Sequence, residues 1–481
     1  MLDVSDISLL RDLAFVGGKW CGAENEARFA VNNPATSAHI QCVPNMGGME
    51  TRAAIASCVK AQPLWAAETA ATRPAILMHW FILIHENIAD LALILSADCS
   101  KPIAEARGEV SYGAGFVQWY AEEAKTVYGE IIPGHQTDKR LVVLRQPVGV
   151  VAAIATSNFP NAIITRKFAP APAGGCAVVL KPSEKTPLSA LALAVLAQRA
   201  GLPDGLMNVV TGQNSAEIGG VLCSDPDVRA LIVTGSTAVG RRLMAQCALT
   251  IKKLGLELGS NAPFLVFDDA DLDEAVAGAI LAKFRNNGQT CVCASRFYVQ
   301  AKVYDAFVHK LTAATQHLRV GSDGDLGPLI NVSARNKVEA HVADALSKGA
   351  RLLSGGARHA LGGNFFQPTV MADLNQDMLI AHEETFGPVA AVFRFETDRQ
   401  AIDLANASDV GLAAYVYTND MRRVRRVAEA LQTGMVGVDS GLISTELAPL
   451  GGIKQSGLGR EGSRHGLDEH QETKYLCLGG I

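Results

Sequence analysis

Two cysteines stand two positions apart in "FRNNGQTCVCASR", residues 284–296. Cys291 could be a nucleophile, half of a disulfide, a metal ligand or a small buried residue. A catalytic thiol must reach the thiolate form, which a turn with nearby amides favours. The stretch "FRNNGQT" predicts a helix that ends at Gly288, so that Cys291 falls on a turn. Burial as a small hydrophobe remains the commoner role of a cysteine.

Two other segments offer the groups that acyl chemistry on a cysteine needs. In "GLELGSN", Glu257 ends an apolar run beside a glycine, where a partly desolvated carboxylate could act as a base. In "TSNFPN", Asn158 supplies an uncharged donor suited to an oxyanion. Cys291, Glu257 and Asn158 together indicate attack by sulfur, stabilisation of the oxyanion and base-assisted release.

Metal binding is not expected. The sequence has no Cys-x2-Cys pair and no His-Glu-x-x-His stretch, and its 11 histidines do not cluster at ligand spacing. Cys291 and Cys293 alone would supply two soft ligands without a partner pair.

Two strand ends suit a phosphate-bearing cofactor. "TGSTAVG", residues 234–240, closes an apolar strand and opens a helix whose first amides could hold a phosphate. Gly235 and Gly240 would let backbones approach closely, although a plain strand–helix turn is the competing interpretation. "LKPSE" ends another strand with Lys181 and Glu184, which could form a surface ion pair or hold ribose hydroxyls.

The composition is that of a folded protein with two or three domains: 481 residues, 48% apolar and 19% charged. A net charge of −5 and a pI near 6.1 give no sign of nucleic-acid binding. The acidic start "MLDVSDISLLRDLAF" is unlike a secretory signal. The apolar stretch 75–97 is interrupted by charges, which favours core helices over a membrane span. The 10 cysteines predict reduced thiols and a cytoplasmic enzyme.

Short apolar strands alternate with helices from about residue 148, which predicts a parallel sheet with helices on both faces. We expect an α/β chain with a Rossmann-like cofactor domain, a second α/β catalytic domain and a small β oligomerisation segment. Exposed edges in that segment predict a partner copy. The expected boundaries are 1–128 with 148–257 for the first domain, 258–444 for the second, and 129–147 with 463–481 for the oligomerisation strands.

Six segments resemble the signature blocks of the aldehyde dehydrogenase superfamily, in family order over nearly the whole chain. They are "KPSEKTP", "TGSTAVG", "LELGSNAP", "FRNNGQTCVCA", "EETFGPV" and "GGIKQSGLGREG". With "NAIITRK" and "GLIS", the set most resembles the bacterial NAD(P)-dependent succinate-semialdehyde dehydrogenases. The resemblance implies an aldehyde dehydrogenase-like fold, a homodimer or homotetramer, and oxidation of an aldehyde to its acid. Succinic semialdehyde is the expected substrate, and another small aldehyde is the alternative.

The resemblance also implies a mechanism. Cys291 attacks the aldehyde, and the Asn158 amide with the Cys291 N–H holds the oxyanion of the thiohemiacetal. Hydride passes to the nicotinamide, and Glu257 activates the water that cleaves the thioester. The resemblance also implies the cofactor contacts. Lys181 and Glu184 would bind the ribose, Ser236 with Gly235 the pyrophosphate, and Glu384 with Phe386 the nicotinamide side. Ser183, Thr156 and Ser157 would also contact the cofactor.

The resembled semialdehyde enzymes place a carboxylate clamp at Arg166, Arg285 and Ser444. A guanidinium suits this role because it pairs with a carboxylate through two hydrogen bonds. Pairing of either arginine with a local acid is the alternative.

Glu184 favours NAD over NADP, because an acid beside the adenosine ribose repels the extra phosphate. Ser183 could donate a hydrogen bond to that phosphate, and Lys185 could neutralise it. We therefore expect NAD to be preferred and NADP to be usable.

The chain departs from the family pattern at several places. Thr156 and Ser157 replace the usual Pro-Trp, which removes a large ring from the cofactor and substrate walls. Ser260 replaces a glycine, and so would restrict the backbone there. Asp98–Ser100 replaces Glu-x-Gly, and Asp439 stands where asparagine is frequent. None of these removes a catalytic group.

Two functions of other classes compete with aldehyde oxidation. Gly-Gln-x-Cys also occurs in thiol proteases, but a cysteine hydrolase or transferase needs a histidine base, and no histidine falls in a signature block near Cys291. A non-catalytic binding protein would be favoured by loss of Cys291 or Glu257, and both are present. Cys293 could resolve an oxidised Cys291 as a disulfide partner, or it could simply be buried.

Overall fold

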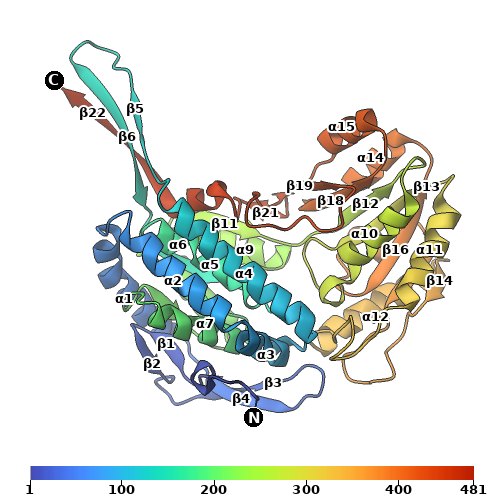
Figure 1. Cartoon of the computed structure of the whole chain (residues 1–481), viewed down its shortest axis with the longest axis horizontal. Coiled ribbons are helices and arrows are strands. Elements are labelled where there is room, and N and C mark those ends of the chain that lie inside the picture. The colour runs from blue at the N-terminus through green and yellow to red at the C-terminus, as the bar shows by residue number, and fades with distance from the viewer. Residues whose placement is uncertain (1, 481) are drawn as a thin grey trace.

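The computed structural model describes residues 2–480 as an α/β chain built on two large sheets (Figure 1). Helices α2 (Thr72–Glu86) and α3 (Ile88–Cys99) occupy the long apolar stretch of the sequence. No single helix within 2–480 is long and apolar enough to span a membrane, although α2 and α3, bent by 74°, pass that test as a pair. Both pack into the core through residues such as Trp80 and Leu95.

The first sheet has the strand order β2-β1-β9-β8-β7-β10-β11-β21. The five strands from β9 to β11 in this order are parallel, as the alternating pattern predicted, whereas β1, β2 and β21 run antiparallel at the edges. β1 and β2 must be antiparallel because the two-residue turn Gly17–Gly18, with φ of 61° and 80°, joins them. The strands are β1 (Ala14–Val16), β2 (Lys19–Cys21), β7 (Val150–Ile154), β8 (Ala177–Lys181), β9 (Met207–Val209), β10 (Val228–Thr234), β11 (Lys253–Glu257) and β21 (Gly457–Leu458).

Helices cover both faces of this sheet. Alternate residues of β7 face opposite layers: Val151 and Ala153 pack with α2 to α7, whereas Val150 and Ala152 pack with α1, α8 and α9. The helices are α1 (Gly48–Ala66), α4 (Ile103–Glu123), α5 (Ala162–Phe168), α6 (Pro170–Ala173), α7 (Leu188–Arg199), α8 (Ser215–Ser224) and α9 (Thr237–Cys247). Near the N-terminus lie η1 (Ile7–Leu9) and the hairpin of β3 (Arg28–Asn32) and β4 (His39–Pro44).

The second sheet has the order β14-β15-β16-β13-β12-β18-β19 and is parallel except for β14. Its strands are β12 (Ala262–Val266), β13 (Ala294–Gln300), β14 (Arg351–Ser354), β15 (Thr369–Leu374), β16 (Val389–Phe395), β18 (Ala413–Tyr417) and β19 (Met435–Val438). Its helices are α10 (Leu272–Phe284), α11 (Tyr304–Gln316), α12 (Val332–Ser347), α13 (Leu379–His382), α14 (Asp398–Asn406) and α15 (Met421–Ala430). The Asp271 side chain caps α10 by accepting the N–H groups of Asp273 and Glu274.

A third, small sheet projects from the body as an arm (Figure 1). It consists of β5 (Glu130–Ile132), β6 (Lys139–Pro147) and β22 (Gln471–Gly479), in the order β22-β6-β5. β22 pairs with β6 over its whole length, so two segments far apart in the sequence form one unit. The remaining short elements are β17 (Val410–Gly411), β20 (Ile453–Lys454), η2 (Arg285–Gly288) and η3 (Arg464–His470).

Candidate active site

Cys291 lies on a turn that follows three residues in the left-handed region. α10 ends at Phe284, earlier than the predicted end at Gly288. Asn286, Asn287 and Gly288 have φ of 51°, 55° and 74°, a conformation that asparagine and glycine adopt more readily than other residues. The Asn-Asn-Gly sequence therefore ends the helix and carries Cys291 out of it.

The Cys291 thiol is half-buried and faces a narrow cavity of about 20 Å³ that Asn158 and Arg166 also line. Burial raises the pKa of this thiol well above its usual value, and the charge of the Glu257 carboxylate raises it further, while the charge of Arg166 lowers it. The sulfur is therefore protonated at neutral pH. Glu257 is the neighbouring group able to take the proton when the sulfur attacks.

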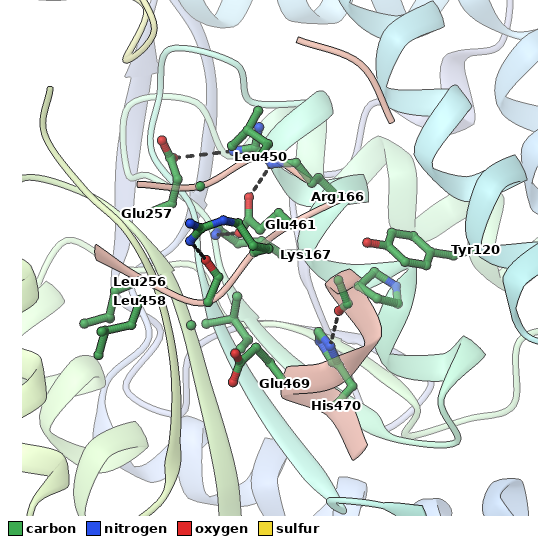
Figure 2. Close-up of a pocket in the computed structure, with 17 residues that line it drawn as sticks. Tyr120, Arg166, Lys167, Leu256, Glu257, Leu450, Leu458, Glu461, Glu469 and His470 are labelled. Carbon is green, nitrogen blue, oxygen red and sulfur yellow. Dashed lines mark hydrogen bonds and ion pairs between the residues drawn. The ribbon is translucent and has the colours of Figure 1, made fainter. Parts of the chain in front are cut away.

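Glu257 is the last residue of β11 and belongs to a buried network of charges (Figure 2). Its Oε2 lies 3.5 Å from the Arg166 guanidinium, whereas its Oε1 has no hydrogen-bond partner within residues 2–480. Arg166 and Lys167, both on α5, pair with Glu461. Burial opposes the charge of Glu461, but the two cations hold its pKa below the usual value. The free Oε1 of Glu257 is thus the atom available to accept a proton.

Asn158 follows β7 and lines the same cavity. The Nδ2 atom donates to the Gln289 carbonyl at 3.0 Å, and the Oδ1 atom accepts from the Thr156 hydroxyl at 2.7 Å. One N–H of the amide remains for an oxyanion. The Asn158 carbonyl oxygen accepts from Lys101 Nζ at 3.0 Å and from Asn286 Nδ2 at 2.8 Å.

Arg285 and Ser444 line both this inner cavity and an adjoining one of about 510 Å³. The Arg285 guanidinium lies over the Phe159 ring, 4.9 Å from its centre, and within residues 2–480 no carboxylate is within ion-pair distance of it. Arg285 is half-buried, so its charge is available to a group in the cavity.

Arg166 differs from Arg285. Its side chain is only 6% exposed, and its guanidinium is paired with Glu461 and faces Glu257. Pairing with local acids, the alternative given above, is therefore the arrangement found for Arg166. A direct role for it in the carboxylate clamp stays a prediction.

The carboxyl ends of four parallel strands lie at one edge of the first sheet. Ile154 of β7 pairs with Lys181 and Val233, and Thr234 pairs with Glu257. This edge gathers the residues predicted to contact the cofactor, which are Thr156, Ser157, Lys181, Ser183, Glu184, Gly235 and Ser236. Ligands of parallel sheets bind at such an edge.

The side chains along this edge make few contacts of their own. Lys181 Nζ lies 3.3 Å from the Glu184 carboxylate, and Ser236 caps α9. Gly240 has a different role from the predicted one: a Cβ there would stand 2.5 Å from the Leu258 side chain, so the glycine lets α9 pack on the adjoining strand segment. Gly235, in contrast, has no atom closer than 3.7 Å to such a Cβ, which leaves room beside its backbone.

Glu384 and Phe386 come from the second sheet's side of the site. Gly288 (φ 74°) lets the loop before Cys291 lie against the Gly387 carbonyl, because a Cβ there would be 2.2 Å from that oxygen. Burial raises the pKa of Glu384 to about 8, and the charge of Glu257 adds to the effect. Phe386 has a φ of 55°, an unusual conformation for a bulky residue and one found at functional sites.

Cys293 faces a different cavity from Cys291. Its buried thiol donates to the Lys283 carbonyl at 3.5 Å and lines a small cavity with Tyr415, while the Cys291 thiol lines the inner one. Both thiols are free. A disulfide between them needs the turn to rearrange, so the redox pair stays a prediction.

Cys291 and Asn158 thus line one cavity with Arg166, and Arg166 faces Glu257 at the carboxyl edge of the first sheet. A family model described as "Aldehyde dehydrogenase family" matches residues 20–476. This chain belongs to the aldehyde dehydrogenase family. Aldehyde dehydrogenases oxidise aldehydes to carboxylic acids with NAD(P). The match spans Cys291, Glu257 and Asn158, and it sets aside the thiol hydrolase and the non-catalytic protein.

Relatives of this dehydrogenase are similar along their whole length. Glutarate-semialdehyde dehydrogenase of Pseudomonas aeruginosa is 56% identical, and each chain is covered completely. Succinate-semialdehyde dehydrogenase [NADP(+)] of Escherichia coli is 54% identical, over 99% of this chain and 100% of the relative. The crystal structure of succinate-semialdehyde dehydrogenase from Burkholderia pseudomallei matches with a TM-score of 0.98 at 55% identity, over 99% of this chain and 100% of that one.

The buried charged groups around the candidate catalytic residues could not be found from the sequence. Lys101 and Glu109 form an ion pair with both side chains 1% exposed. Glu461 stands in a recognised block, yet its pairing with α5 gave no local signal. Glu109 gave no local signal either, because Glu105 and Arg107 stand near it in the sequence and make it resemble an exposed helix face.

Three of the departures from the family pattern, Ser260, Asp439 and Asp98, are accommodated locally. Ser260 lies outside the left-handed region, so the restriction expected from replacing glycine brings no strain. Asp439, with a φ of 46°, is in a conformation that aspartate tolerates. Asp98 is buried and accepts the N–H and hydroxyl of Ser189 at 2.8 and 3.1 Å; burial raises its pKa to about 8.

Proposed function

We propose that this enzyme oxidises a short semialdehyde with a terminal carboxylate, succinic semialdehyde first and glutaric semialdehyde second. Arg285 carries the proposal, because it is a half-buried cation without an acid partner in residues 2–480 and it lines the cavities that lead to Cys291. Ser444 adds a hydroxyl to the same walls. Two of the similar proteins are named for glutarate semialdehyde and succinate semialdehyde, which supports this substrate class.

In the proposed reaction, the Cys291 sulfur adds to the aldehyde carbon while Glu257 Oε1 takes the thiol proton. The Asn158 amide and the Cys291 backbone N–H hold the resulting oxyanion. Bound NAD(P)+ supplies the hydride acceptor. The acyl group then stays on Cys291 as a thioester. Glu257 releases the thiol proton to solvent, takes a proton from the water that attacks the thioester, and returns that proton to the departing Cys291 thiolate. Arg166 and Glu461 keep the Glu257 carboxylate in place.

NAD is the proposed preferred cofactor, with NADP as the second. The Lys181 amine is buried beside Glu184, whose side chain is 30% exposed at the end of β8. This pair suits the hydroxyls of a ribose, and the carboxylate would repel a phosphate. Ser183 and Lys185 favour some NADP use, and the E. coli relative is named for NADP(+). The other proposed contacts are Thr156, Ser157, Gly235, Ser236, Glu384 and Phe386.

A panel of aldehydes that differ in length and terminal charge, each assayed with NAD and with NADP, tests this proposal. We expect kcat/KM to be highest for a four- or five-carbon ω-carboxylate aldehyde with NAD. Equal kcat/KM for butanal and succinic semialdehyde would reject the substrate class, and a strong preference for NADP would reject the cofactor assignment.

We propose that the arm makes a homodimer or homotetramer. Ile131, Tyr128 and Tyr475, on or beside its strands, are 76%, 76% and 56% exposed. Exposure of such large apolar side chains to water is unfavourable, and a second copy of the chain would cover them. Replacing Ile131 with Lys should lower the mass measured by light scattering.

The proposed domain boundaries are those expected from the sequence, 1–128 with 148–257, 258–444, and the arm at 129–147 and 463–481. Strand β21 lies outside these bounds. Because β21 pairs with β11, the residues next to it would also belong to the first domain. The ten free cysteines support a reducing cytoplasmic compartment.

A further inference from the structure

The backbone of Asn158 is fixed from the buried side of its loop. Lys101 Nζ donates to the Asn158 carbonyl at 3.0 Å and lies 3.9 Å from the centre of the Phe159 ring. Lys101 is itself paired with Glu109, whose Oε1 accepts the N–H of Asn161 at 2.9 Å, just before α5. Because these groups are buried and charged, the peptide that carries Asn158 has little freedom to move.

The remaining freedom is the orientation of the Asn158 amide about its last bond. A rotation by half a turn would exchange the N–H donors for the Oδ1 acceptor, which repels an oxyanion. The observed orientation is unambiguous, because the Gln289 carbonyl can only accept and therefore faces Nδ2. Oδ1 then faces the Thr156 hydroxyl at 2.7 Å, and that hydroxyl must be the donor.

We propose that Thr156 is a positioning residue whose hydroxyl holds the Asn158 amide with its free N–H toward the oxyanion. Thr156 is one of the two residues that depart from the family's Pro-Trp, and proline has neither a hydroxyl nor another side-chain donor. The inference rests on the proposed role of Asn158 in the reaction. It assigns Thr156 to the geometry of the oxyanion rather than to the cofactor alone.

The test compares Thr156→Val, which removes the hydroxyl at nearly constant shape, with Thr156→Ser, which keeps it. Thr315→Val is the matched control, since Thr315 is fully buried in α11 and its hydroxyl has no partner within residues 2–480. Cofactor Kd and thermal stability are measured for each variant, and the rate constant of nucleotide reduction is measured in a single turnover with succinic semialdehyde.

Loss of one neutral hydrogen bond predicts a single-turnover rate about three- to tenfold lower in Thr156→Val. KM and cofactor Kd should stay within about twofold, and Thr156→Ser should restore the rate. In an Asn158→Ala background, Thr156→Val should cause no further loss, because the amide it positions is gone.

An equal loss from Thr156→Val in both backgrounds would overturn the proposal, as would a Thr156→Ser variant as slow as Thr156→Val. A weaker cofactor Kd with an unchanged single-turnover rate would also overturn it. If the proposed role of Asn158 in the reaction were wrong, the Asn158→Ala variant by itself would reduce nucleotide at the wild-type rate.

Discussion

Replacement of Arg285 by Met should separate charged from uncharged substrates. The guanidinium has no acid partner in residues 2–480, so its removal leaves no protein carboxylate unpaired. A hydrogen bond to a charged group contributes about 1.5–3 kcal/mol, and about 1.4 kcal/mol is a factor of ten. We therefore expect kcat/KM for succinic semialdehyde to fall about tenfold to about 150-fold, mostly through KM.

The assay follows nucleotide reduction with succinic semialdehyde and with butanal, which has the same number of carbons and no carboxylate. Butanal kcat/KM should change less than about threefold in Arg285→Met. Arg399→Met, at an exposed arginine of α14, is the control. Arg166→Met should slow both substrates, because Glu257 would lose its cation and Glu461 would lose one of its two. Equal losses for both aldehydes in Arg285→Met would refute the clamp.

Three further predictions concern the nucleophile, the cofactor and stability. Cys291→Ala should abolish aldehyde oxidation and leave the cofactor Kd, measured by fluorescence titration, nearly unchanged; steady turnover in this variant would contradict the mechanism. Glu184→Ser should shift the kcat/KM ratio toward NADP by about tenfold to about a hundredfold, since relief of a like-charge contact contributes about 1.4–2.8 kcal/mol; an unchanged ratio would mean that Glu184 does not face the ribose. Burial raises the pKa of Asp98 to about 8 in the native state, whereas its ordinary pKa is 3.8. Between these pH values the native chain keeps this proton and the unfolded chain loses it, so the free energy of unfolding falls as pH rises through this window. Asp98→Asn should therefore raise Tm relative to wild type more at pH 9 than at pH 5, and a constant difference would contradict the buried, protonated Asp98.

The alternation of apolar strands and helices was enough to predict parallel α/β sheets and the strand ends that carry Lys181 and Ser236. Hydrophobic periodicity and the residues that favour turns are local properties of the sequence, and they locate the ends of strands well. The antiparallel β21 could not be predicted in this way. Its two residues have no periodicity of their own, and only the distant β11 makes them a strand.

The candidate site shows the same contrast between local sequence signals and contacts that only the fold creates. Cys291 and Asn158 stand out by residue type, but the partners of Asn158 lie far away in the sequence. Lys101 is 57 positions from Asn158, and Gln289 is 131 positions from it. The difference between Arg285 and Arg166 likewise depends on Glu461, which the fold alone brings to α5. Burial and pairing decided the roles of charged residues, and neither can be read from local sequence.

The covalent acyl intermediate on Cys291 is the central claim, and it can be trapped directly. Glu257→Gln should reduce one equivalent of nucleotide per active site, more slowly than the wild type because the thiol has lost its neighbouring base, and should then stop because no base activates the water. Mass spectrometry of the protein quenched after mixing with succinic semialdehyde and NAD+ should find one succinyl group, on the peptide that contains Cys291, and none without the nucleotide. An unmodified Cys291 after the burst, or an acyl group on another residue, would contradict the account.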